Sequence, residues 1–275
     1  MYARAAIGLV PGFNRPGWLP DAVLERTGVT VDRTHLAEYN RVCGFRLSDT
    51  LPATYPHVLA FRLAFRLMSR RDFPFPVVGL IHVANRIELH RPIDAGEALD
   101  LSVHAADLRE HPRGRQLDIV ATAAVDGEVV WRDVSTYLRR EGRAQGGRRE
   151  SDQAEPPAAS ARWRLSPRVG TDYARVSGDH NPIHTSRLGA RLFGFPRPIA
   201  HGMWSKARCL AALEGRLPEA YTVDVSFKLP VLLPSTVAFA AAPDWTFALH
   251  SAKSGKPHLA GTVTGWSGDP GLAAQ

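Results

Sequence analysis

A six-residue stretch that occurs twice constrains the fold of this chain more than any other feature of its sequence. Residues 39–44 are YNRVCG and residues 173–178 are YARVSG, so four of six positions are identical at a spacing of 134 residues. Each copy is followed by an apolar segment with helical periodicity and then by several strand-like runs. The 275 residues, 44% of them hydrophobic, are enough for two packed units. The sequence therefore predicts two similar halves that pack as a built-in dimer.

The apolar segment after each copy predicts one long helix in each half. In residues 54–70, large apolar side chains recur at intervals of three and four positions, and residues 197–213 carry a similar stripe. Pro56 and Pro198 lie near the starts of these segments, where the first turn of a helix tolerates proline. Because an apolar stripe must be covered, we expect both helices to be largely buried.

Strand-like runs follow each predicted helix and indicate the fold class. They are bounded by glycine and proline, which interrupt strands. The runs are residues 79–90, 97–108, 116–125 and 128–140 in the first half and residues 221–231, 235–242, 244–252 and 258–266 in the second. The sequence therefore predicts an α+β fold with two curled antiparallel sheets, each wrapped around one long apolar helix.

A change in composition separates the two predicted halves. Residues 142–160 are mostly Gly, Arg, Gln, Glu, Pro, Ala and Ser. A segment of this composition cannot bury enough apolar surface to order itself. We therefore predict a flexible linker at 142–160, between an N-terminal half at 1–141 and a C-terminal half at 161–275.

The net charge of +7 does not by itself indicate a nucleic-acid partner. Residues 138–150 carry five arginines against two glutamates, so the linker region supplies almost half of the excess. No aromatic residues are interleaved with this charge, and no nucleic-acid-binding motif accompanies it. We expect no nucleic-acid partner, and the remaining excess would suit a small anionic ligand.

Cysteine content and the N-terminal sequence bear on the cellular compartment. Cys43 and Cys209 are the only cysteines, too few for a disulfide framework, so we expect two buried, inert thiols in a reducing compartment. The apolar run near the N-terminus is broken by Pro11 and Gly12 and is too short for a secretion signal. No uninterrupted apolar stretch could span a bilayer. We expect a cytoplasmic protein without membrane association.

Residues 173–184, YARVSGDHNPIH, gather several proton-handling side chains where a helix must end. Pro182 lacks an N–H and disfavours a helical conformation in the preceding residue, so a helix through this stretch ends near Gly178. The turn that follows can bring His184 back toward Asp179, whereas a continuous helix would point the two apart. A carboxylate and an imidazole that converge in this way suit general acid–base chemistry on a water molecule.

Residues 197–203, RPIAHGM, can supply a second part of the same site. A helix that begins here has unpaired N–H groups and a partial positive charge at its first turn. Gly202 has no side chain, so a ligand carbonyl can approach its N–H closely. The sequence thus predicts an oxyanion-binding amide beside the acid–base pair.

Three stretches carry a family resemblance. Residues 173–184, FGFPRPIAHGM at 193–203 and VSFKLPV at 225–231 resemble the (R)-specific enoyl-thioester hydratase signature of the MaoC-like hot-dog family. The whole arrangement resembles the double-hot-dog members, which include mycobacterial 3-hydroxyacyl-thioester dehydratases. Over residues 1–140 the likeness rests mainly on the order of elements. The resemblance implies a double hot-dog fold and reversible syn addition of water to a trans-2-enoyl thioester, which gives a (3R)-hydroxyacyl thioester in fatty-acyl metabolism.

The resemblance also implies roles for individual residues. It makes Asp179 and His184 the catalytic dyad and the amide of Gly202 the donor to the thioester oxygen. Substrate binding is assigned to three more residues, Asn181, Arg197 and His201. In the first half, Phe45 and Thr50 stand where Asp179 and His184 would be, so we expect one active site per chain.

The substrate carrier and the assembly follow from the same resemblance. We expect no metal and no separate cofactor, because CoA or the pantetheine arm of an acyl carrier protein is part of the substrate. Arg197, with Lys206 or Arg208, is a candidate contact for its phosphates. The two halves would form a built-in pseudo-dimer, and a further homodimer is left open. The apolar stretch 58–65 is either ordinary core or the border of an acyl tunnel.

Several alternatives stay open. A non-enzymatic acyl-thioester binding subunit would lack dependence on the dyad. A hot-dog acyl thioesterase would usually need a carboxylate on or near the central helix, and residues 199–213 contain none. A zinc site at His180 and His184 is disfavoured, because Pro182 breaks the helix that this spacing requires. The carrier, the chain length, the physiological direction and the division of acid and base between the dyad residues are not determined.

Overall fold

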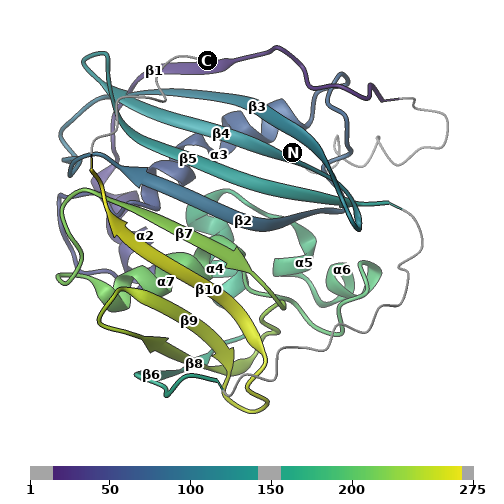
Figure 1. Ribbon diagram of the computed structural model, residues 1–275, viewed down its shortest axis with the longest axis vertical. Coiled ribbons are helices and arrows are strands. Elements are labelled where there is room, and N and C mark those ends of the chain that lie inside the picture. Colours follow the sequence, from purple (N-terminus) through teal and green to yellow (C-terminus); the bar gives the residue numbers. More distant parts are fainter. Residues whose placement is uncertain (1–14, 142–155, 268–275) are drawn as a thin grey trace.

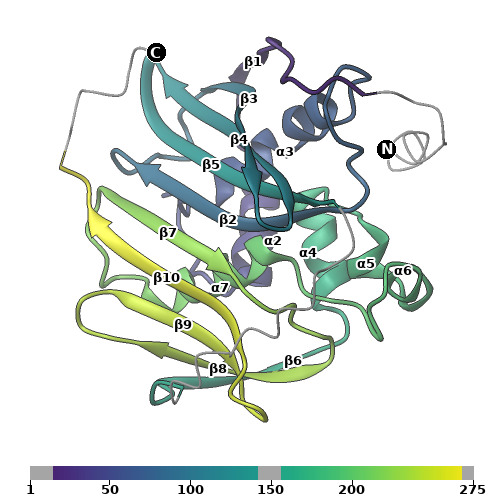
Figure 2. The same ribbon diagram turned by 45° about the vertical axis from the view of Figure 1, so that its right-hand side comes forward.

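The structure is a computed structural model, and it describes residues 15–141 and 156–267. Ten strands of this part of the chain form one curved sheet, and the long helices lie together on one of its faces (Figures 1 and 2). The order across the sheet is β1-β3-β4-β5-β2-β7-β10-β9-β8-β6, and every neighbouring pair is antiparallel. One half of the sheet therefore comes from each half of the sequence.

The elements repeat in the same order along the chain. The first half contributes β1 (Leu24–Val29), α2 (Arg33–Cys43), α3 (Tyr55–Met68), β2 (Leu80–Leu89), β3 (Leu99–His111), β4 (Gly114–Val125) and β5 (Glu128–Arg140). The second contributes β6 (Ala161–Leu165), α4 (Val169–Ser177), α5 (Pro182–Thr185), α6 (Arg187–Leu192), α7 (Gly202–Leu213), β7 (Tyr221–Phe227), β8 (Ser235–Ala241), β9 (Thr246–Ser251) and β10 (Pro257–Gly265). All eight strands expected from the sequence are present, and α5 and α6 are additions specific to the second half.

The expectation of two separate sheets is corrected by the pairing of β2 with β7. These strands are antiparallel, from Ala84 opposite Ser226 to Leu89 opposite Tyr221, and they join the halves into one sheet. An unpaired edge strand exposes a row of backbone donors and acceptors. Pairing the corresponding edges of the two halves satisfies both rows at once, which a strand-by-strand prediction cannot detect.

The two copies of the repeated hexapeptide are the C-terminal ends of α2 and α4. Each helix stops at a glycine in the left-handed region, Gly44 with φ 85° and Gly178 with φ 76°, where a residue with a Cβ would be strained. The helices pack against each other, and the rings of Tyr39 and Tyr173 are 6.3 Å apart. The hexapeptide is therefore a helix stop and a helix–helix contact in both halves.

One of the two long helices starts where the sequence predicted and the other does not. Helix α3 has Pro56 in its first turn, as predicted. Helix α7 begins only at Gly202, so the prediction that Pro198 lies in its first turn is wrong. The N–H groups of Ile199 and Ala200 donate outside the helix, to backbone carbonyls at 3.1 and 2.9 Å. Cross-chain hydrogen bonds thus keep this approach segment extended and delay the helix start.

Besides α5 and α6, two strands and one helix were not anticipated. Strands β1 and β6 are short and form the two outer edges of the sheet. Most residues of β1 are exposed, so the strand lacks the apolar alternation that identifies a half-buried strand. Helix α2 precedes α3 in the position that α4 has in the second half. An edge strand shows no alternation of apolar and polar residues, because few of its side chains are buried.

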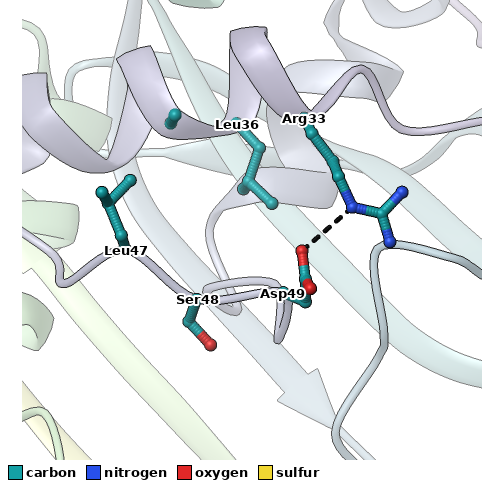
Figure 3. A pocket seen from close by; sticks show the side chains of 6 residues that line it. Arg33, Leu36, Leu47, Ser48 and Asp49 are labelled. Atoms are coloured by element: carbon teal, nitrogen blue, oxygen red, sulfur yellow. Dashed lines mark hydrogen bonds and ion pairs between the residues drawn. The ribbon is translucent and has the colours of Figure 1, made fainter.

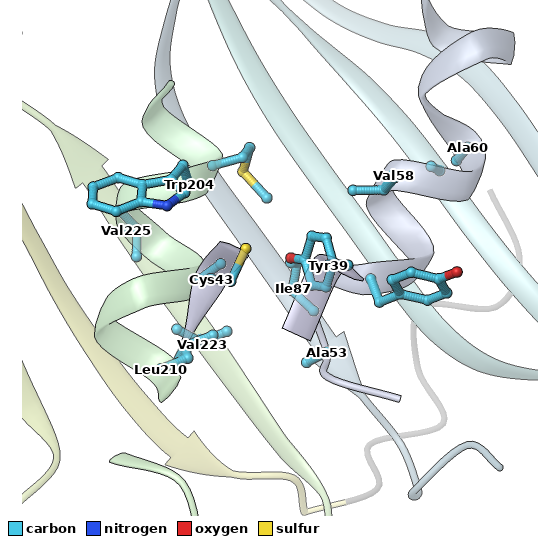
Figure 4. Close-up of a cluster of buried hydrophobic side chains, with 14 of the residues drawn as sticks. Tyr39, Cys43, Ala53, Val58, Ala60, Ile87, Trp204, Leu210, Val223 and Val225 are labelled. Carbon is cyan, nitrogen blue, oxygen red and sulfur yellow. The ribbon is translucent and has the colours of Figure 1, made fainter. Parts of the chain in front are cut away.

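The buried core crosses from one half to the other. Figure 4 shows Trp204, Val223 and Val225 of the second half beside Tyr39 and Cys43 of the first, all members of one cluster of buried side chains. The indole Nε1 of Trp204 donates to the backbone carbonyl of Val42 at 3.1 Å, which ties α7 to α2. Cys43 and Cys209 are free and buried, as expected, and burial raises the pKa of both thiols.

Two expectations concern segments or properties that the structure addresses only in part. Residues 142–155 of the predicted linker lie outside the described residues, so the domain boundaries stay a prediction. None of the helices in the described ranges is both long and apolar enough to cross a membrane.

Candidate active site

The end of α4 fixes the position of Asp179. The hydroxyl of Ser177, the last helical residue, accepts the N–H of Asp179 at 3.2 Å. Carboxylate oxygen Oδ1 of Asp179 in turn accepts the N–H of Asn181 at 3.1 Å. The helix therefore stops where the sequence predicted, and Ser177 is a helix-end hydroxyl. These two bonds hold the carboxylate in the tight turn that follows Gly178.

Asn181 starts the short helix that carries His184. Its Oδ1 accepts the N–H of Ile183 at 3.3 Å, and Pro182 occupies the first position of α5, where no N–H is needed. The His184 N–H donates to the Asn181 carbonyl at 2.9 Å. The side-chain oxygen of Asn181 is thus used to build the turn, and its assignment to substrate binding stays a prediction.

The turn brings the predicted pair together and adds a third group. One carboxylate oxygen of Asp179 and one ring nitrogen each of His184 and His201 lie within 4.8 Å of one another. Asp179 is partly exposed, whereas both imidazoles are buried. The turn after α4, the short helix α5 and the segment before α7 therefore converge on a single point. All three residues were candidate site residues in the sequence.

The hydrogen bond of His184 determines which of its nitrogens is available. Nδ1 lies 2.8 Å from the carbonyl oxygen of Ile199, which can only accept, so Nδ1 carries the proton. Burial lowers the pKa of His184, although the charge of Asp179 and the bond to Ile199 act in the opposite direction. The ring is therefore neutral near pH 7, and Nε2 presents a lone pair that can accept a proton.

His201 braces the two dyad residues. Its Nε2 donates to the backbone carbonyl of Asp179 at 3.0 Å and lies 3.8 Å from Oδ2 of the same residue. Its ring stacks on His184 with centroids 3.7 Å apart. Burial, followed by the neighbouring His184, lowers the pKa of His201 to about 3, so this ring is neutral. Its ring contacts Asp179, His184 and Tyr173, and its assignment to substrate binding stays a prediction.

Gly202 is the first residue of α7, with His201 as the N-cap. The Ser205 N–H donates to the His201 carbonyl at 3.1 Å and closes the first turn, so the N–H of Gly202 precedes the intrahelical ladder. A Cβ at this position would lie 3.1 to 3.2 Å from ring carbons of Phe227. The phenyl ring thus packs directly on the glycine, and a side chain at this position would crowd Phe227 at the helix start.

The three candidate phosphate contacts lie in different environments. Nη1 of Arg197 donates to the Pro234 carbonyl at 3.0 Å on a partly exposed segment, so its phosphate role stays a prediction. Lys206 is completely buried, with Nζ donating to the carbonyls of Asn85 and Val223, and cannot contact a carrier phosphate. Arg208 stacks over the Trp163 ring at 4.3 Å. Lys206 and Arg208 therefore anchor α7 to neighbouring strands.

A second carboxylate–imidazole pair lies in the first half and was missed. Nδ1 of His57, on α3, is 2.9 Å from Oδ2 of Asp133, on β5. A strand alternates faces, so Asp133, Ser135 and Tyr137 share one side of β5 with the buried Trp131. Polar residues at inward positions of an apolar strand are the signal that could have identified this cluster.

Asp179, His184 and His201 each offer one atom of a type that can bind a metal ion. However, Nε2 of His201 already donates to a backbone carbonyl, and its Nδ1 has no partner among the described residues. The set offers one carboxylate and two neutral imidazoles, and His180 is exposed outside it. The absence of a metal and of a separate cofactor remains an expectation from the sequence.

Comparisons with known proteins show which proteins this chain is similar to. A family model described as MaoC like domain matches residues 150–243, which include α4 to α7 and β7. The 3-hydroxyacyl-thioester dehydratase X of Mycobacterium tuberculosis is 39% identical over 268 residues, covering 95% of this chain and 96% of the relative. The enoyl-CoA hydratase ChsH3 of the same organism is 24% identical over 79% of this chain and 78% of its own.

Solved structures extend the likeness to the whole fold. The crystal structure of HtdX from Mycobacterium tuberculosis at 2.4 Å resolution superposes with a TM-score of 0.80 at 38% sequence identity. The match covers 89% of this chain and 100% of that one, so it includes the half without the dyad. Identity at this level over nearly the full length of both chains shows that the protein belongs to the MaoC-like dehydratase family.

Proposed function

We propose that the protein is a hydro-lyase that interconverts trans-2-enoyl thioesters and (3R)-hydroxyacyl thioesters in fatty-acyl metabolism. One observation carries the proposal. A neutral imidazole with a free Nε2 lone pair and a carboxylate converge beside an uncovered helix N-terminus. That combination can bind a water molecule and stabilise negative charge on a neighbouring thioester oxygen.

Each group has one task in the hydration direction. His184 Nε2 takes a proton from water while the water oxygen bonds to C3 of the enoyl group. Electrons of the double bond move toward the thioester, whose oxygen gains negative charge and accepts the N–H of Gly202. His184 then returns the proton to C2, so both parts of one water molecule add from the same side. Asp179 accepts a hydrogen bond from the second water proton and orients the oxygen.

The arrangement supports His184 as the group that moves the proton. Its Nδ1–H is held by the Ile199 carbonyl, so the lone pair points away from that bond and stays available. His201 keeps Asp179 in place through the backbone and is a positioning residue. Dehydration follows the same steps in reverse. The relative with 39% identity is named a dehydratase and ChsH3 is named a hydratase, which fits reversible chemistry.

The substrate carrier and cellular setting belong to the same proposal. The thioester is carried by CoA or by acyl carrier protein, and its pantetheine enters with the substrate. Each half of the sheet with its long helix serves as one hot-dog unit, and the two units act as a built-in pseudo-dimer. The reaction takes place in the cytoplasm without a metal or a separate cofactor.

Hydration of crotonyl-CoA tests the proposal directly. Loss of the absorbance of the conjugated thioester measures the rate, and a stereospecific 3-hydroxyacyl-CoA dehydrogenase identifies the configuration at C3. We expect turnover that yields only the (3R) product. Binding without turnover would indicate an acyl-thioester binding subunit, and release of free thiol would indicate a thioesterase. Either result would overturn the hydro-lyase assignment.

A further inference from the structure

The pair His57–Asp133 belongs to a connected polar cluster inside the first half. Asn85 Nδ2 donates to both oxygens of Asp133 and to Ser135 Oγ, each at 3.0 Å, and the Ser135 hydroxyl donates to Asp133 at 2.8 Å. Although burial alone would raise it, His57, Asn85 and Lys206 hold the pKa of Asp133 below its ordinary value. Asp133 is therefore a buried carboxylate that accepts hydrogen bonds from His57, Asn85 and Ser135.

One side chain beside this cluster has a polar atom without a protein partner. His82, on β2, stacks on Tyr137 with ring centroids 4.7 Å apart and on His57 at 6.5 Å. Among the described residues, no group hydrogen-bonds to the buried Nε2 of His82. A buried polar atom without a partner is unfavourable, so its retention requires a physical reason.

The cluster adjoins the dyad through two independent routes. Phe227 packs on Gly202 on one side and meets the His82 ring at 4.9 Å on the other. On the opposite wall, Phe61 lies one helical turn after His57, and its ring is 3.8 Å from where a Cβ of Gly178 would be. Helices α3, α4 and α7 and strands β2 and β7 therefore place the cluster next to the reacting centre.

Tyr137, on β5, lies directly opposite His82 on β2. Burial, followed by the charges of Asp179 and Asp133, raises the pKa of its phenol, so the phenol keeps its proton and can donate it in a hydrogen bond. His57 is also partly accessible, with 15% of its side chain exposed, although its partner Asp133 is buried. An acyl group that extends from Gly202 past Phe227 toward the first half therefore approaches His82, on which Tyr137 and His57 stack.

We propose that the first half recognises a hydroxyl group on the acyl chain of the substrate, beyond C3, through His82, Tyr137 and His57. This inference rests on the hydro-lyase function proposed above and names its substrate class. The site takes hydroxyacyl thioesters in preference to simple alkyl thioesters of equal length. The half without a dyad then serves as a specificity element.

The donors and acceptors of the cluster match a hydroxyl group better than other substituents. The Asp133 carboxylate accepts from Nδ1 of His57, so Nε2 is the nitrogen of this ring that remains for a ligand. Burial and the nearby His57 keep His82 neutral, with a pKa of about 3, and its ring also bonds to the backbone of Ala84. Tyr137 supplies an O–H donor. A hydroxyl both donates and accepts, so it can satisfy an imidazole nitrogen and the phenol together, whereas a keto oxygen satisfies only the phenol.

Chain-matched substrates test the proposal. The probes are trans-2-octenoyl-CoA, its 5-, 6- and 7-hydroxy derivatives and the corresponding oxo compounds. We expect at least one hydroxy isomer to exceed octenoyl-CoA in kcat/KM by about tenfold or more, because a site built to bond a hydroxyl discriminates against the analogue that lacks it. The oxo compound at the same carbon should fall between the two.

Two variants separate recognition from a structural role. Tyr137→Phe removes one oxygen, and His82→Gln removes the ring; each should bring the ratio of kcat/KM for the hydroxy and alkyl substrates toward one. The matched control is Tyr221→Phe. Tyr221 is a buried tyrosine at the opposite end of β7 from Phe227, so this substitution should leave the ratio unchanged. Circular dichroism verifies that each variant is folded.

The outcomes are distinct from those that bear on the hydro-lyase function. If octenoyl-CoA is the best substrate of the series, or if Tyr137→Phe lowers kcat/KM equally for both substrate types, the specificity proposal is wrong while hydration itself stands. A wild-type protein that hydrates none of the compounds contradicts the proposed function. A hydroxy preference that both variants abolish supports the inference.

Discussion

The two halves share an order of elements but differ at the residues that follow the repeated hexapeptide. After Gly178 the chain forms the turn and short helix that carry Asp179 and His184. After Gly44 it places Phe45 against Tyr39, with ring centroids 6.4 Å apart, and runs on through an exposed loop. The same helix stop is therefore followed by a reactive turn in one half and by a packing contact in the other.

The exposed loop of the first half lines a shallow surface pocket with the start of α2. Figure 3 shows Leu36, Leu47 and Ser48 around it, and an ion pair between Arg33 and Asp49 at 3.0 Å. Both partners of this pair are more than half exposed, so water screens the attraction and the pair contributes little to stability. The position that holds the dyad in the second half is a solvated surface here.

The long helices differ in the same way at their first residues. Helix α7 begins with Gly202, which leaves a backbone N–H uncovered. Helix α3 begins with Tyr55, which is completely buried, and continues with Pro56, which has no N–H to offer. A helix start can serve as an oxyanion site only where side chains leave room for the ligand. The comparison teaches that the repeat preserved the scaffold while the chemistry depends on a few residues at helix ends.

The largest expected difference between the halves is catalytic. Asp179→Asn and His184→Ala should each lower kcat for crotonyl-CoA by a factor of about 10² to 10⁴, the usual contribution of a positioned acid or base. Thr50→Ala, at the corresponding position of the first half, should change kcat less than about twofold, because Thr50 is exposed and remote from the reaction. Steady-state kinetics on the folded proteins decide this. Near-normal turnover of Asp179→Asn would refute the dyad.

Lys206 tests the tie between the halves. Lys206→Met should lower the free energy of unfolding by about 2–4 kcal/mol, because it leaves the Asn85 and Val223 carbonyls with fewer donors and the buried Asp133 with less positive charge nearby. Arg187→Met, on an exposed position, is the control and should change it by less than about 0.5 kcal/mol. Urea denaturation gives both values. Equal stability of the two variants would contradict the role of Lys206.

The same variant predicts a pH dependence. Burial lowers the pKa of Lys206 from 10.5 to about 7, so between these values the folded state binds fewer protons than the unfolded state. The free energy of unfolding contributed by this group therefore rises with pH across that interval. Relative to Lys206→Met, the wild-type protein should gain stability between pH 7 and pH 9. A difference that falls or stays constant with pH would show that the lysine is not desolvated.

Gly202 sharpens the comparison of helix starts. Gly202→Ala should lower kcat/KM about tenfold to hundredfold, since the new methyl group crowds Phe227 and covers the amide that we assign to the thioester oxygen. Gly17→Ala, where no atom lies within 4 Å of the added Cβ, is the control and should leave kinetics unchanged. Unaltered kinetics for Gly202→Ala would exclude this amide as the oxyanion donor.

The acid side of the pH–rate profile reports on His184. Protonation of Nε2 abolishes its ability to accept a proton, so activity is lost as pH falls through the pKa of His184 in the folded protein. Burial lowers that pKa, and the acid limb of kcat/KM should therefore lie below pH 6.5. Crotonyl-CoA kinetics from pH 4.5 to 8 measure it, with Thr50→Ala expected to give the same profile. An acid limb above pH 6.5 would contradict a desolvated His184.

The two helix-stop glycines provide the smallest expected effect and the closest match. Gly178→Ala should cost about 1 kcal/mol of stability through its left-handed backbone. Gly44→Ala should cost somewhat more, because the added Cβ would also displace the Arg208 guanidinium. Only Gly178→Ala should also lower kcat, since Asp179 follows it directly. Thermal unfolding and kinetics on both variants make the test; a kcat loss in Gly44→Ala would show that the first half acts on the reaction.

The sequence alone was sufficient for the repeat, the eight inner strands and the convergence of Asp179 with His184. Glycine and proline identified where helices and strands stop, because their backbone limits act locally. The approach of His184 to Asp179 was predicted for the same reason, since Pro182 and Gly178 constrain a turn of a few residues. The family resemblance added the substrate class.

Tertiary structure decided everything that depends on contacts between distant residues. Pairing of β2 with β7 made one sheet of two, because backbone donors and acceptors are the same in every strand and carry no mark of their partner in sequence. Lys206, a candidate phosphate ligand in the sequence, is completely buried and donates to the carbonyls of Asn85 and Val223. The meeting of His57 with Asp133, separated by 76 residues, arose because helix α3 packs on the face of the sheet to which inward positions of β5 point. Hydrogen bonds and desolvation act through space, and only the folded chain specifies which groups they join.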